Sequence, residues 1–313
     1  MFVARTIPEL ISHRAAIEPG QRVAFVPTMG ALHAGHRSLI TMARSLADVV
    51  VVSIFVNPLQ FGPAEDFARY PRPLDHDLQV CDQDGVGLVF VPSVEDLYPP
   101  GRSVSVAAGP VGGSFEGRFR PGHFDGVLTV VAKLFNLVDP QVAIFGQKDA
   151  QQLACIRRMV VDLNAGVDIV GAPIVREADG LAMSSRNAYL SPAERVLART
   201  LFAALSAGAG FSTPAESLSA ARSVLAMSET DPAFSLDYLA LVNPETFASA
   251  TAAFEGEALL IVAGRVGSTR LIDNVPVTLT GPGGTGSLVS AGSAGSPEYA
   301  PSSGVASPPS AGG

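Results

Sequence analysis

The sequence predicts an α/β fold, a doubly wound parallel sheet followed by a smaller C-terminal α+β domain. Apolar runs alternate with stretches of helical periodicity through the first half of the chain. Three of these runs are apolar at successive positions, as in parallel strands that are covered on both faces. From about residue 175 the pattern changes to two amphipathic helices followed by strands. The first unit is therefore expected to be Rossmann-like, with ligands bound above the carboxyl ends of its strands.

The first unit is expected to contain five strands joined by helices. Strands are predicted at residues 22–26, 49–56, 88–91, 141–145 and 167–170. Helices are predicted at residues 35–47, 75–84, 124–138 and 149–163. The segments that leave the strands at residues 27, 57 and 146 should therefore meet at one edge of the sheet.

The second unit is expected to be smaller and mixed. Helices are predicted at residues 190–207 and 215–227, and strands at 236–242, 259–265 and 270–273. A tight hairpin at residues 266–268 joins the last two strands. We expect domains at residues 1–174 and 175–280. Residues 281–313 are mostly Gly, Ser, Pro and Ala, so a disordered tail is expected there.

Composition excludes several classes of protein. The chain has 313 residues, a formal net charge of −8 and a pI near 5.1, which argues against broad nucleic-acid binding. Cys81 and Cys155 are too few for a disulfide scaffold. The longest apolar run is far shorter than the roughly 18 residues of a membrane span, and the N-terminus lacks a signal-peptide core. A cytoplasmic protein without nucleic-acid or membrane partners is expected.

The turn after the first predicted strand carries the strongest functional signal. Residues 23–36 read VAFVPTMGALHAGH, a strand and a glycine-containing turn before a helix. The free N–H groups and positive dipole end of such a helix favour an anion. His33 and His36 add hydrogen-bond donors, and Gly35 lets a ligand approach the backbone. The turn therefore predicts a nucleotide site.

Two other interpretations of this histidine pair are metal binding and ordinary loop polarity. No third or fourth metal ligand lies nearby at a recognised spacing. The sequence also lacks a Walker A motif, a GxGxxG fingerprint after the first strand, and a GxSxG elbow.

Two amides follow the second predicted strand. Asn57 and Gln60 can hydrogen-bond a hydroxyl or a carboxylate without adding a competing charge. The Asn57-Pro58 pair also suits a plain turn, so Gln60 is the better ligand candidate.

The fourth predicted strand ends in a similar polar turn. Gly146 permits close approach, and Lys148 places a positive charge for phosphate at a helix start. Asp149 either accepts hydrogen bonds from a ribose or stabilises the helix start. Gln152 shares its face of the helix.

A third polar segment, MSSRN, covers residues 183–187. Two hydroxyls beside a guanidinium suit a polyphosphate, because arginine can bind two oxygens at once. Alone, the segment is a weak signal and is more typical of a surface loop. Together with the other two turns it indicates phosphate binding.

Five segments together resemble one known family. They are PTMGALHAGH at 27–36, FVNPLQF at 55–61, FEGRFRPGHFDGVLTVV at 115–131, FGQKDAQQL at 145–153 and READGLAMSSRN at 176–187. In this order and spacing they resemble the pantothenate synthetase (pantoate–β-alanine ligase) family, over the N-terminus to about residue 277. HxGH alone indicates only the wider nucleotidyltransferase and class I synthetase group.

The resemblance implies an ATP-dependent ligase that works in two steps. The carboxylate of pantoate attacks the α-phosphate of ATP, which releases pyrophosphate and leaves pantoyl adenylate. The amine of β-alanine then displaces AMP and gives pantothenate. Mg²⁺ is expected with the ATP, bound mostly through phosphate oxygens and water. A homodimer is also implied.

The resemblance further implies a role for each matching residue. His36 corresponds to the proton donor, and Gln60 and Gln152 to the pantoate-binding glutamines, with Gln60 also near β-alanine. The catalytic set is His36, His33, Lys148, Ser184, Ser185 and Arg186. The ATP site comprises Met29, Gly30, Ala31, Leu32, His33, Ala34, Gly35, His36, Gly146, Gln147, Lys148, Asp149, Val175, Met183, Ser184, Ser185 and Arg186.

The sequence departs from the family pattern in two places. Ala150 stands where a tyrosine is common, and His76 where relatives often have another acid. The latter bears on Asp77, the candidate metal ligand. The main alternative function is nucleotidyl transfer onto a phosphorylated acceptor, but such enzymes are usually shorter and end with an ISSTxxR-like motif. A non-catalytic nucleotide-binding module is the third hypothesis.

Overall fold

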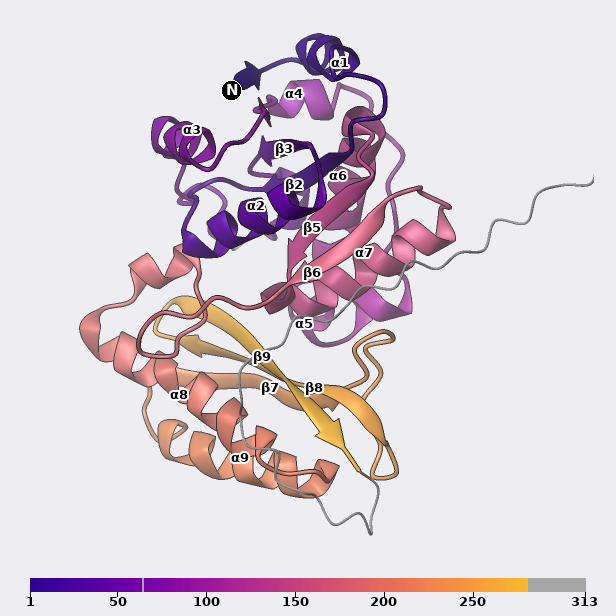
Figure 1. Cartoon of the computed structure of the whole chain (residues 1–313). Coiled ribbons are helices and arrows are strands. Elements are labelled where there is room, and N and C mark those ends of the chain that lie inside the picture. The colour runs from indigo at the N-terminus through magenta and orange to yellow at the C-terminus, as the bar shows by residue number, and fades with distance from the viewer. Residues whose placement is uncertain (64, 281–313) are drawn as a thin grey trace, which may run out of the picture.

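A six-stranded parallel sheet forms the larger part of the computed structural model, which describes residues 1–63 and 65–280 (Figure 1). The strand order is β1-β4-β3-β2-β5-β6, and every neighbouring pair is parallel. The strands are β1 (Phe2–Ala4), β2 (Val23–Thr28), β3 (Val49–Ile54), β4 (Leu88–Phe90), β5 (Val142–Gly146) and β6 (Asp168–Ala172). The expected tail at residues 281–313 lies outside the described residues.

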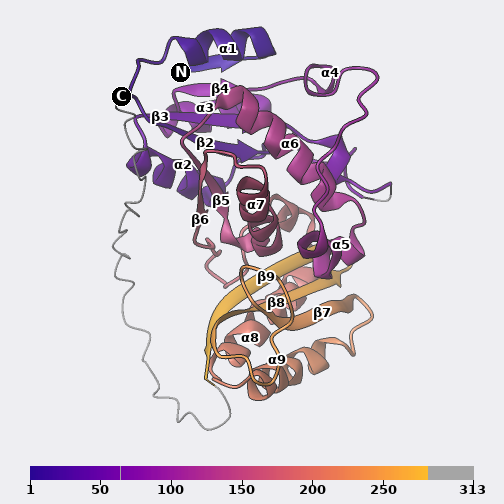
Figure 2. The ribbon, with the colours of Figure 1, turned by 90° about the vertical axis from the view of Figure 1, so that its right-hand side faces the viewer.

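Helices cover both faces of this sheet (Figure 2). On one face lie α1 (Ile7–Ala15), α6 (His123–Val138) and α7 (Ala150–Asp162), and on the other α2 (Ala34–Leu46) and α3 (Leu74–Gln83). Successive residues of β2 serve the two layers, since Phe25 packs on the first and Val26 on the second. This two-sided burial explains why the strand is apolar at every position from Val23 to Val26.

The direction of winding reverses between β2 and β5. The chain adds β3 and β4 on one side of β2, then crosses over to add β5 and β6 on the other. The carboxyl ends of β2 and β5 therefore flank a topological switch point, where open α/β sheets bind their ligands. The predicted doubly wound sheet and its five strands are confirmed, with small shifts at the strand ends.

Two elements at the N-terminus, β1 and α1, were not predicted from the sequence. The strand has only three residues, too few to show periodicity, and α1 fully buries only Leu10. A capping box was nevertheless present as a signal, because Thr6 accepts from the Glu9 amide while the Glu9 carboxylate accepts from the Thr6 amide.

A three-stranded antiparallel sheet, β7-β8-β9, forms the smaller unit. Its strands are β7 (Phe234–Val242), β8 (Gly256–Val266) and β9 (Thr269–Leu279), and α8 (Pro192–Ala209) and α9 (Pro214–Ser228) pack against it. The predicted hairpin is confirmed, since Val266 pairs with Thr269 around a two-residue turn. The prediction ended β9 too early, at residue 273. Because β9 is an edge strand, Pro276 can lie in it with its nitrogen facing away from β8.

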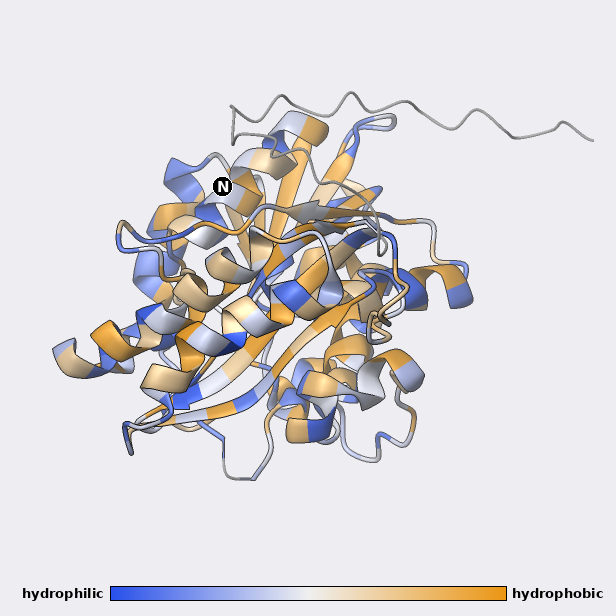
Figure 3. Ribbon diagram, turned by 90° about the horizontal axis from the view of Figure 1, so that it is seen from below, coloured by the Kyte–Doolittle hydropathy of each residue, from blue (hydrophilic) through white to orange (hydrophobic). Residues whose placement is uncertain are grey.

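The second sheet lies between its own helices and the first unit (Figures 1 and 2). Phe247 and Ile261 pack against Ala154 of α7 and so join the two units through an apolar contact. Figure 3 shows hydrophobic residues along the strands of both sheets. Within residues 1–63 and 65–280, no helix combines the length and apolar character that crossing a membrane requires. The remaining short elements are η1 (Pro58–Gln60), α4 (Val94–Leu97), η2 (Pro110–Gly113), α5 (Phe115–Phe119), η3 (Gln147–Asp149) and η4 (Ser185–Tyr189).

Candidate active site

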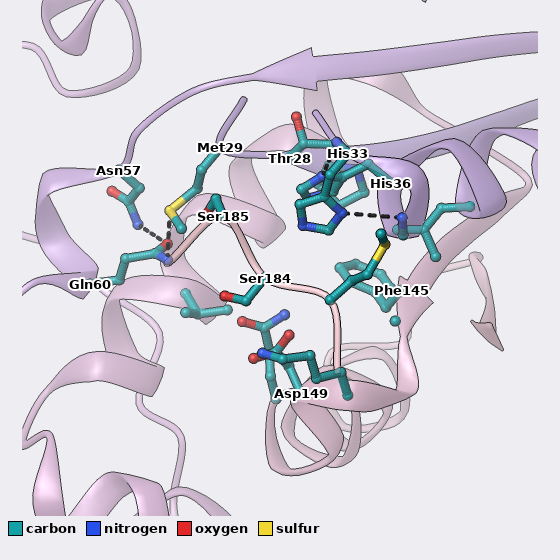
Figure 4. A pocket seen from close by; sticks show the side chains of 18 of the residues that line it. Thr28, Met29, His33, His36, Asn57, Gln60, Phe145, Asp149, Ser184 and Ser185 are labelled. Carbon is teal, nitrogen blue, oxygen red and sulfur yellow. Dashed lines mark hydrogen bonds between the residues drawn. The ribbon is translucent and has the colours of Figure 1, made fainter. Parts of the chain in front are cut away.

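A cavity of about 230 Å³ opens at the carboxyl ends of β2 and β5 (Figure 4). It brings together the three polar segments that the sequence predicted, together with both glutamines. The predicted residues that line it are Met29, His33, Gly35, His36, Gln60, Gly146, Lys148, Asp149, Gln152, Val175, Met183, Ser184, Ser185 and Arg186. Residues from the first unit and from the segment that leads into the second therefore form its wall.

Several other predicted residues do not line this cavity. Leu32 is buried in the layer between the sheet and α2, and the side chain of Gln147 is exposed. Gly30, Ala31 and Ala34 belong to the turn and the start of α2, but they are also absent from the cavity wall. Their expected contact with a nucleotide stays a prediction.

The two histidines cap the helix that they begin. His33 is the N-cap of α2, and its Nδ1 accepts a hydrogen bond from the Gly35 amide at 3.1 Å. His36 Nδ1 accepts in turn from the His33 amide at 3.4 Å. This is a capping box built from imidazoles in place of hydroxyl and carboxyl groups. Because each Nδ1 is an acceptor, each Nε2 carries the proton and is the remaining donor of its ring.

Gly35 makes this cap possible. A Cβ at position 35 would lie 3.0 Å from His33 Nδ1 and closer still to its Cε1. The close approach that the sequence predicted for a ligand at Gly35 is thus made by the His33 ring. The two imidazole centroids are 4.1 Å apart, and both rings lie beside each other at the cavity (Figure 4).

Both imidazoles are neutral at physiological pH. Burial, together with the neighbouring His33 and Lys148, lowers the pKa of His36 to about 3. Burial and Lys148 also lower the pKa of His33. The turn therefore presents neutral N–H donors to the cavity, while Lys148 supplies the positive charge.

Asp77 has a structural role in the turn, and its expected metal-binding role stays a prediction. It is fully buried, and its two carboxylate oxygens accept from the amides of Ala31 at 2.8 Å and Leu32 at 2.7 Å. Ala31 has a φ of +51°, a left-handed conformation that costs energy for a residue with a Cβ. Asp77 thus holds a strained turn before the histidines. His76 beside it is exposed.

Gln60 is oriented by neighbours on other elements. Its Oε1 accepts from Asn57 Nδ2 at 3.1 Å, and its Nε2 lies 3.1 Å from the sulfur of Met29. Asn57 also donates to the Gly126 carbonyl at 3.0 Å. A Cβ at Gly126 would overlap the Leu59 carbonyl, so this glycine lets η1 lie directly on α6. Asn57 therefore orients the side chain of Gln60.

Arg120 and His123 are the residues that sequence reasoning missed. Both line the cavity, and His123 Nδ1 donates to the Gln60 carbonyl at 2.8 Å. Arg120 lies 3.1 Å from His123 Nε2 and pairs with Glu65 at 2.6 Å. Burial and Arg120 lower the pKa of His123 to about 4. The family-like segment at 115–131 contains both residues, and that was the available signal.

The MSSRN segment forms another side of the cavity and approaches the histidine turn at Met183, whose Cβ would lie 3.7 Å from a Cβ at Gly35. Ser184 caps η4 by accepting from the Arg186 amide at 3.3 Å, and the Ser185 hydroxyl is 3.3 Å from that of Tyr70. Asp66 accepts from both Nε and Nη2 of Arg186 at 2.8 Å. This bidentate pair fixes the guanidinium plane and leaves Nη1 as a donor for a ligand.

The assembled groups suit a polyanionic ligand. Lys148, Arg120 and Arg186 supply positive charge, and the imidazoles, hydroxyls and amides supply neutral donors. In the part of the chain that the structure describes, no three His, Cys, Asp or Glu side chains are grouped to hold a metal ion. A polyphosphate-type anion matches the donors of this wall.

Comparisons with known proteins agree with this chemistry. The family described as pantoate-beta-alanine ligase matches residues 2–276. The pantothenate synthetase of Acidothermus cellulolyticus is 59% identical over 282 residues, which cover 88% of this chain and 91% of the relative. That of Thermobifida fusca is 57% identical over 286 residues, covering 88% and 96%.

Solved structures show the same likeness. A crystal structure of pantothenate synthetase from Thermus thermophilus matches with a TM-score of 0.82 and 49% identity, covering 88% of this chain and 99% of that one. Pantoate-beta-alanine ligase from Francisella tularensis, complexed with beta-gamma ATP and beta-alanine, matches with a TM-score of 0.72 and 35% identity, covering 88% and 97%.

Proposed function

The chain belongs to the pantoate–β-alanine ligase family and joins pantoate to β-alanine in an ATP-dependent reaction, and we propose that it does so in the cavity above β2 and β5. The observation that carries this placement is the convergence of three phosphate-type segments and two glutamines on one cavity. The match over residues 2–276 sets the nucleotidyltransferase alternative aside.

The reaction proceeds in two balanced steps in this proposal. A carboxylate oxygen of pantoate forms a bond to the α-phosphorus of ATP, and the bond to pyrophosphate breaks. The β-alanine nitrogen then attacks the acyl carbon of pantoyl adenylate, and AMP leaves with the oxygen while the amine loses a proton. Holding the adenylate and the amine in one cavity supplies proximity and limits hydrolysis of the intermediate.

Each substrate has a matching part of the cavity wall. Gln60 and Gln152 hold pantoate, and Gln60 also lies near β-alanine. Lys148 and Arg186 stabilise the charge that grows on the α-phosphate and on pyrophosphate. Ser184 and Ser185 donate to the same oxygens. The remaining ATP contacts from the cavity wall are those of Met29, Gly35, Gly146, Asp149, Val175 and Met183. Contacts of Gly30, Ala31, Leu32, Ala34 and Gln147, which lie outside that wall, stay predictions from the family resemblance.

His36 acts mainly as a hydrogen-bond donor in this scheme. With a pKa of about 3, it is neutral before substrates bind, so its Nε2–H donates to a phosphate oxygen. Full proton donation to the leaving group requires that nearby phosphates first raise that pKa, because negative charge favours imidazolium. His33 positions the nucleotide from the adjacent ring.

Mg²⁺ enters the proposal with ATP. Mg²⁺ keeps several of its waters and binds through phosphate oxygens, so it does not require a cluster of three protein ligands. Residues 1–63 and 65–280 contain no such cluster. When bound, it neutralises phosphate charge beside Lys148 and Arg186. The family resemblance also implies Asp77 as a Mg²⁺ ligand, and its two oxygens accept from backbone amides in this structure.

Three further features belong to the same proposal. The family resemblance supports a homodimer, which light scattering would test. The acidic net charge and two buried cysteines are compatible with a cytoplasmic location. A boundary near residues 174 and 175 follows from the change of pattern between β6 and α8.

Substrate-dependent product release tests the proposed steps. Pyrophosphate release should require pantoate, and AMP release should require β-alanine as well. Pyrophosphate release that does not depend on pantoate would overturn the adenylate scheme.

A further inference from the structure

Asn274 of β9 binds the backbone of the turn that carries Lys148. Its Nδ2 donates to the carbonyl of Gln147 at 3.0 Å and to that of Lys148 at 3.0 Å. The residue is 4% exposed, so these bonds are shielded from water. It also lines a smaller cavity of about 30 Å³, together with Lys148 and Gln152.

A second contact ties Asn274 to the other phosphate-type segment. The backbone N–H of Asn274 donates to the Asp273 carboxylate at 2.8 Å. The same carboxylate accepts from both terminal nitrogens of Arg176 at 2.6 and 3.0 Å. Arg176 begins the hairpin in which the Met183 amide donates to the Val175 carbonyl at 3.0 Å. That hairpin leads directly into Ser184, Ser185 and Arg186.

The turn at Lys148 needs this outside support. Neither η3 nor α7 has a side-chain cap, so no side chain at its own N-terminus stabilises this start. The Gln147 side chain is exposed, and Gly146 meets nothing within 4 Å of where a Cβ would stand. Pairing of β5 with β6 fixes the turn only as far as Gly146, and the bonds from Asn274 hold the backbone that follows it.

We propose that Asn274 is a positioning residue for ATP, which sets the Lys148 turn at a fixed distance from the Met183–Arg186 loop. This inference rests on the proposed function, because it takes both segments as the phosphate-binding walls. Asn274 acts through the backbone of Lys148 and touches no substrate. A misplacement of about 1 Å at such a wall costs on the order of 100-fold in rate.

Two substitutions and a matched control test the proposal. Asn274→Ala removes both bonds, and Asn274→Asp keeps the size of the side chain while losing its N–H donors. Tyr238→Phe is the control, because it removes a different buried bond between the units, from the Tyr238 hydroxyl to Glu116 at 2.7 Å. All three chains are first compared for melting temperature and circular dichroism.

The decisive readout is pantoate-dependent pyrophosphate release, measured with KM for ATP, pantoate and β-alanine separately. We expect kcat/KM for ATP to fall about 10- to 100-fold in Asn274→Ala, with KM for β-alanine nearly unchanged. Tyr238→Phe should keep wild-type kinetics. A loss of melting temperature without a change in ATP kinetics, in both Asn274 variants, would overturn the proposal and make Asn274 purely structural.

A double-mutant cycle separates action through Lys148 from a general effect. Binding of a non-hydrolysable ATP analogue is measured by calorimetry in the wild type, Asn274→Ala, Lys148→Met and the double variant. If Asn274 acts through Lys148, its substitution has little further effect once the lysine is gone. Fully additive effects would contradict the positioning role. Pantoate-independent pyrophosphate release by the wild type would instead break the proposed function itself.

Discussion

The two helices that begin on either side of the switch point are secured in opposite ways. The start of α2 is held by its own residues, since His33 and His36 cap it, and by Asp77 of the same unit. The start of α7 has no side-chain cap, and the turn before it is held by Asn274, 126 and 127 residues further along the chain. One wall of the site is complete within the first unit, whereas the other depends on docking of the second.

This difference shows how one turn serves both structure and chemistry. Each imidazole turns Nδ1 toward the backbone and leaves Nε2–H for the cavity. A serine or threonine would also cap α2, but its acceptor and its donor would share one oxygen, whereas an imidazole separates them on two ring nitrogens. The histidines thus combine two tasks, while Lys148 leaves the structural task to Asn274.

The largest expected loss of activity comes from substitution of Lys148, in the turn before the uncapped start of α7. Lys148→Met removes the charge but keeps the aliphatic stem, so we expect kcat for pyrophosphate release to fall by about 10³-fold or more. Lys148→Ala should likewise abolish turnover. Because Asn274 holds the backbone, the fold should be unaffected, and circular dichroism with thermal melting checks this. A folded variant with near-wild-type turnover would remove Lys148 from the mechanism.

The histidine turn allows capping and catalysis to be separated. In His36→Asn the side-chain amide oxygen can stand near the position of the imidazole Nδ1 and keep the cap, whereas the Nε2–H donor is lost. His36→Ala removes the capping acceptor as well as the donor. The two substitutions therefore differ in the cap alone.

We expect His36→Asn to lower kcat by about 10²-fold while keeping the wild-type melting temperature. His36→Ala should lose both turnover and part of the stability, because it also removes the capping acceptor. Steady-state kinetics and thermal melting are measured on both variants. Equal losses of stability in the two variants would show that the asparagine oxygen does not replace His36 Nδ1 as the capping acceptor of α2.

The same contrast explains how far the sequence alone predicts this site. His33, His36 and Lys148 directly follow buried strands, so the order of strands and helices places them at one edge of the sheet. Arg120 and His123 reach the site through the Gln60 carbonyl, 60 and 63 residues away in sequence. Only tertiary packing creates that contact, and the same holds for Asn274.

Local pattern missed two features. It did not reveal that the Asp77 carboxylate accepts from two backbone amides, since the metal role of Asp77 was implied only by the family resemblance. β9 continues past Asp273 because an edge strand accepts Pro276. In both cases the deciding partner lies on another element, which periodicity along one segment does not reveal.

Asp77→Ala tests how strongly the first unit holds its own wall. The change leaves the buried amides of Ala31 and Leu32 without an acceptor, so we expect the free energy of unfolding to fall by about 2–4 kcal/mol. The strained Ala31 turn should loosen, and kcat should fall with it. Denaturant titration and kinetics measure both effects. A large increase in the Mg²⁺ concentration that gives half-maximal activity would support the metal-ligand role of Asp77, and an unchanged concentration would exclude it.

Acid sensitivity gives the smallest effect and refines the comparison. The pKa of His36 is about 3 in the folded chain but near 6.5 in the unfolded chain, so the unfolded state binds more protons below pH 6.5. Stability linked to His36 is therefore complete above pH 6.5 and is lost progressively as the pH falls toward 3. Relative to pH 7, this loss amounts to about 2 kcal/mol at pH 5.

His36→Asn isolates this contribution, because it removes the titrating ring and keeps a capping acceptor. We expect its free energy of unfolding to fall less steeply than that of the wild type between pH 7 and pH 5, as measured by denaturant titration at each pH. Parallel pH profiles for the wild type and His36→Asn would mean that water reaches His36 well enough for it to titrate normally. The capping of α2 by His36 would then not depend on burial of the ring in the first unit.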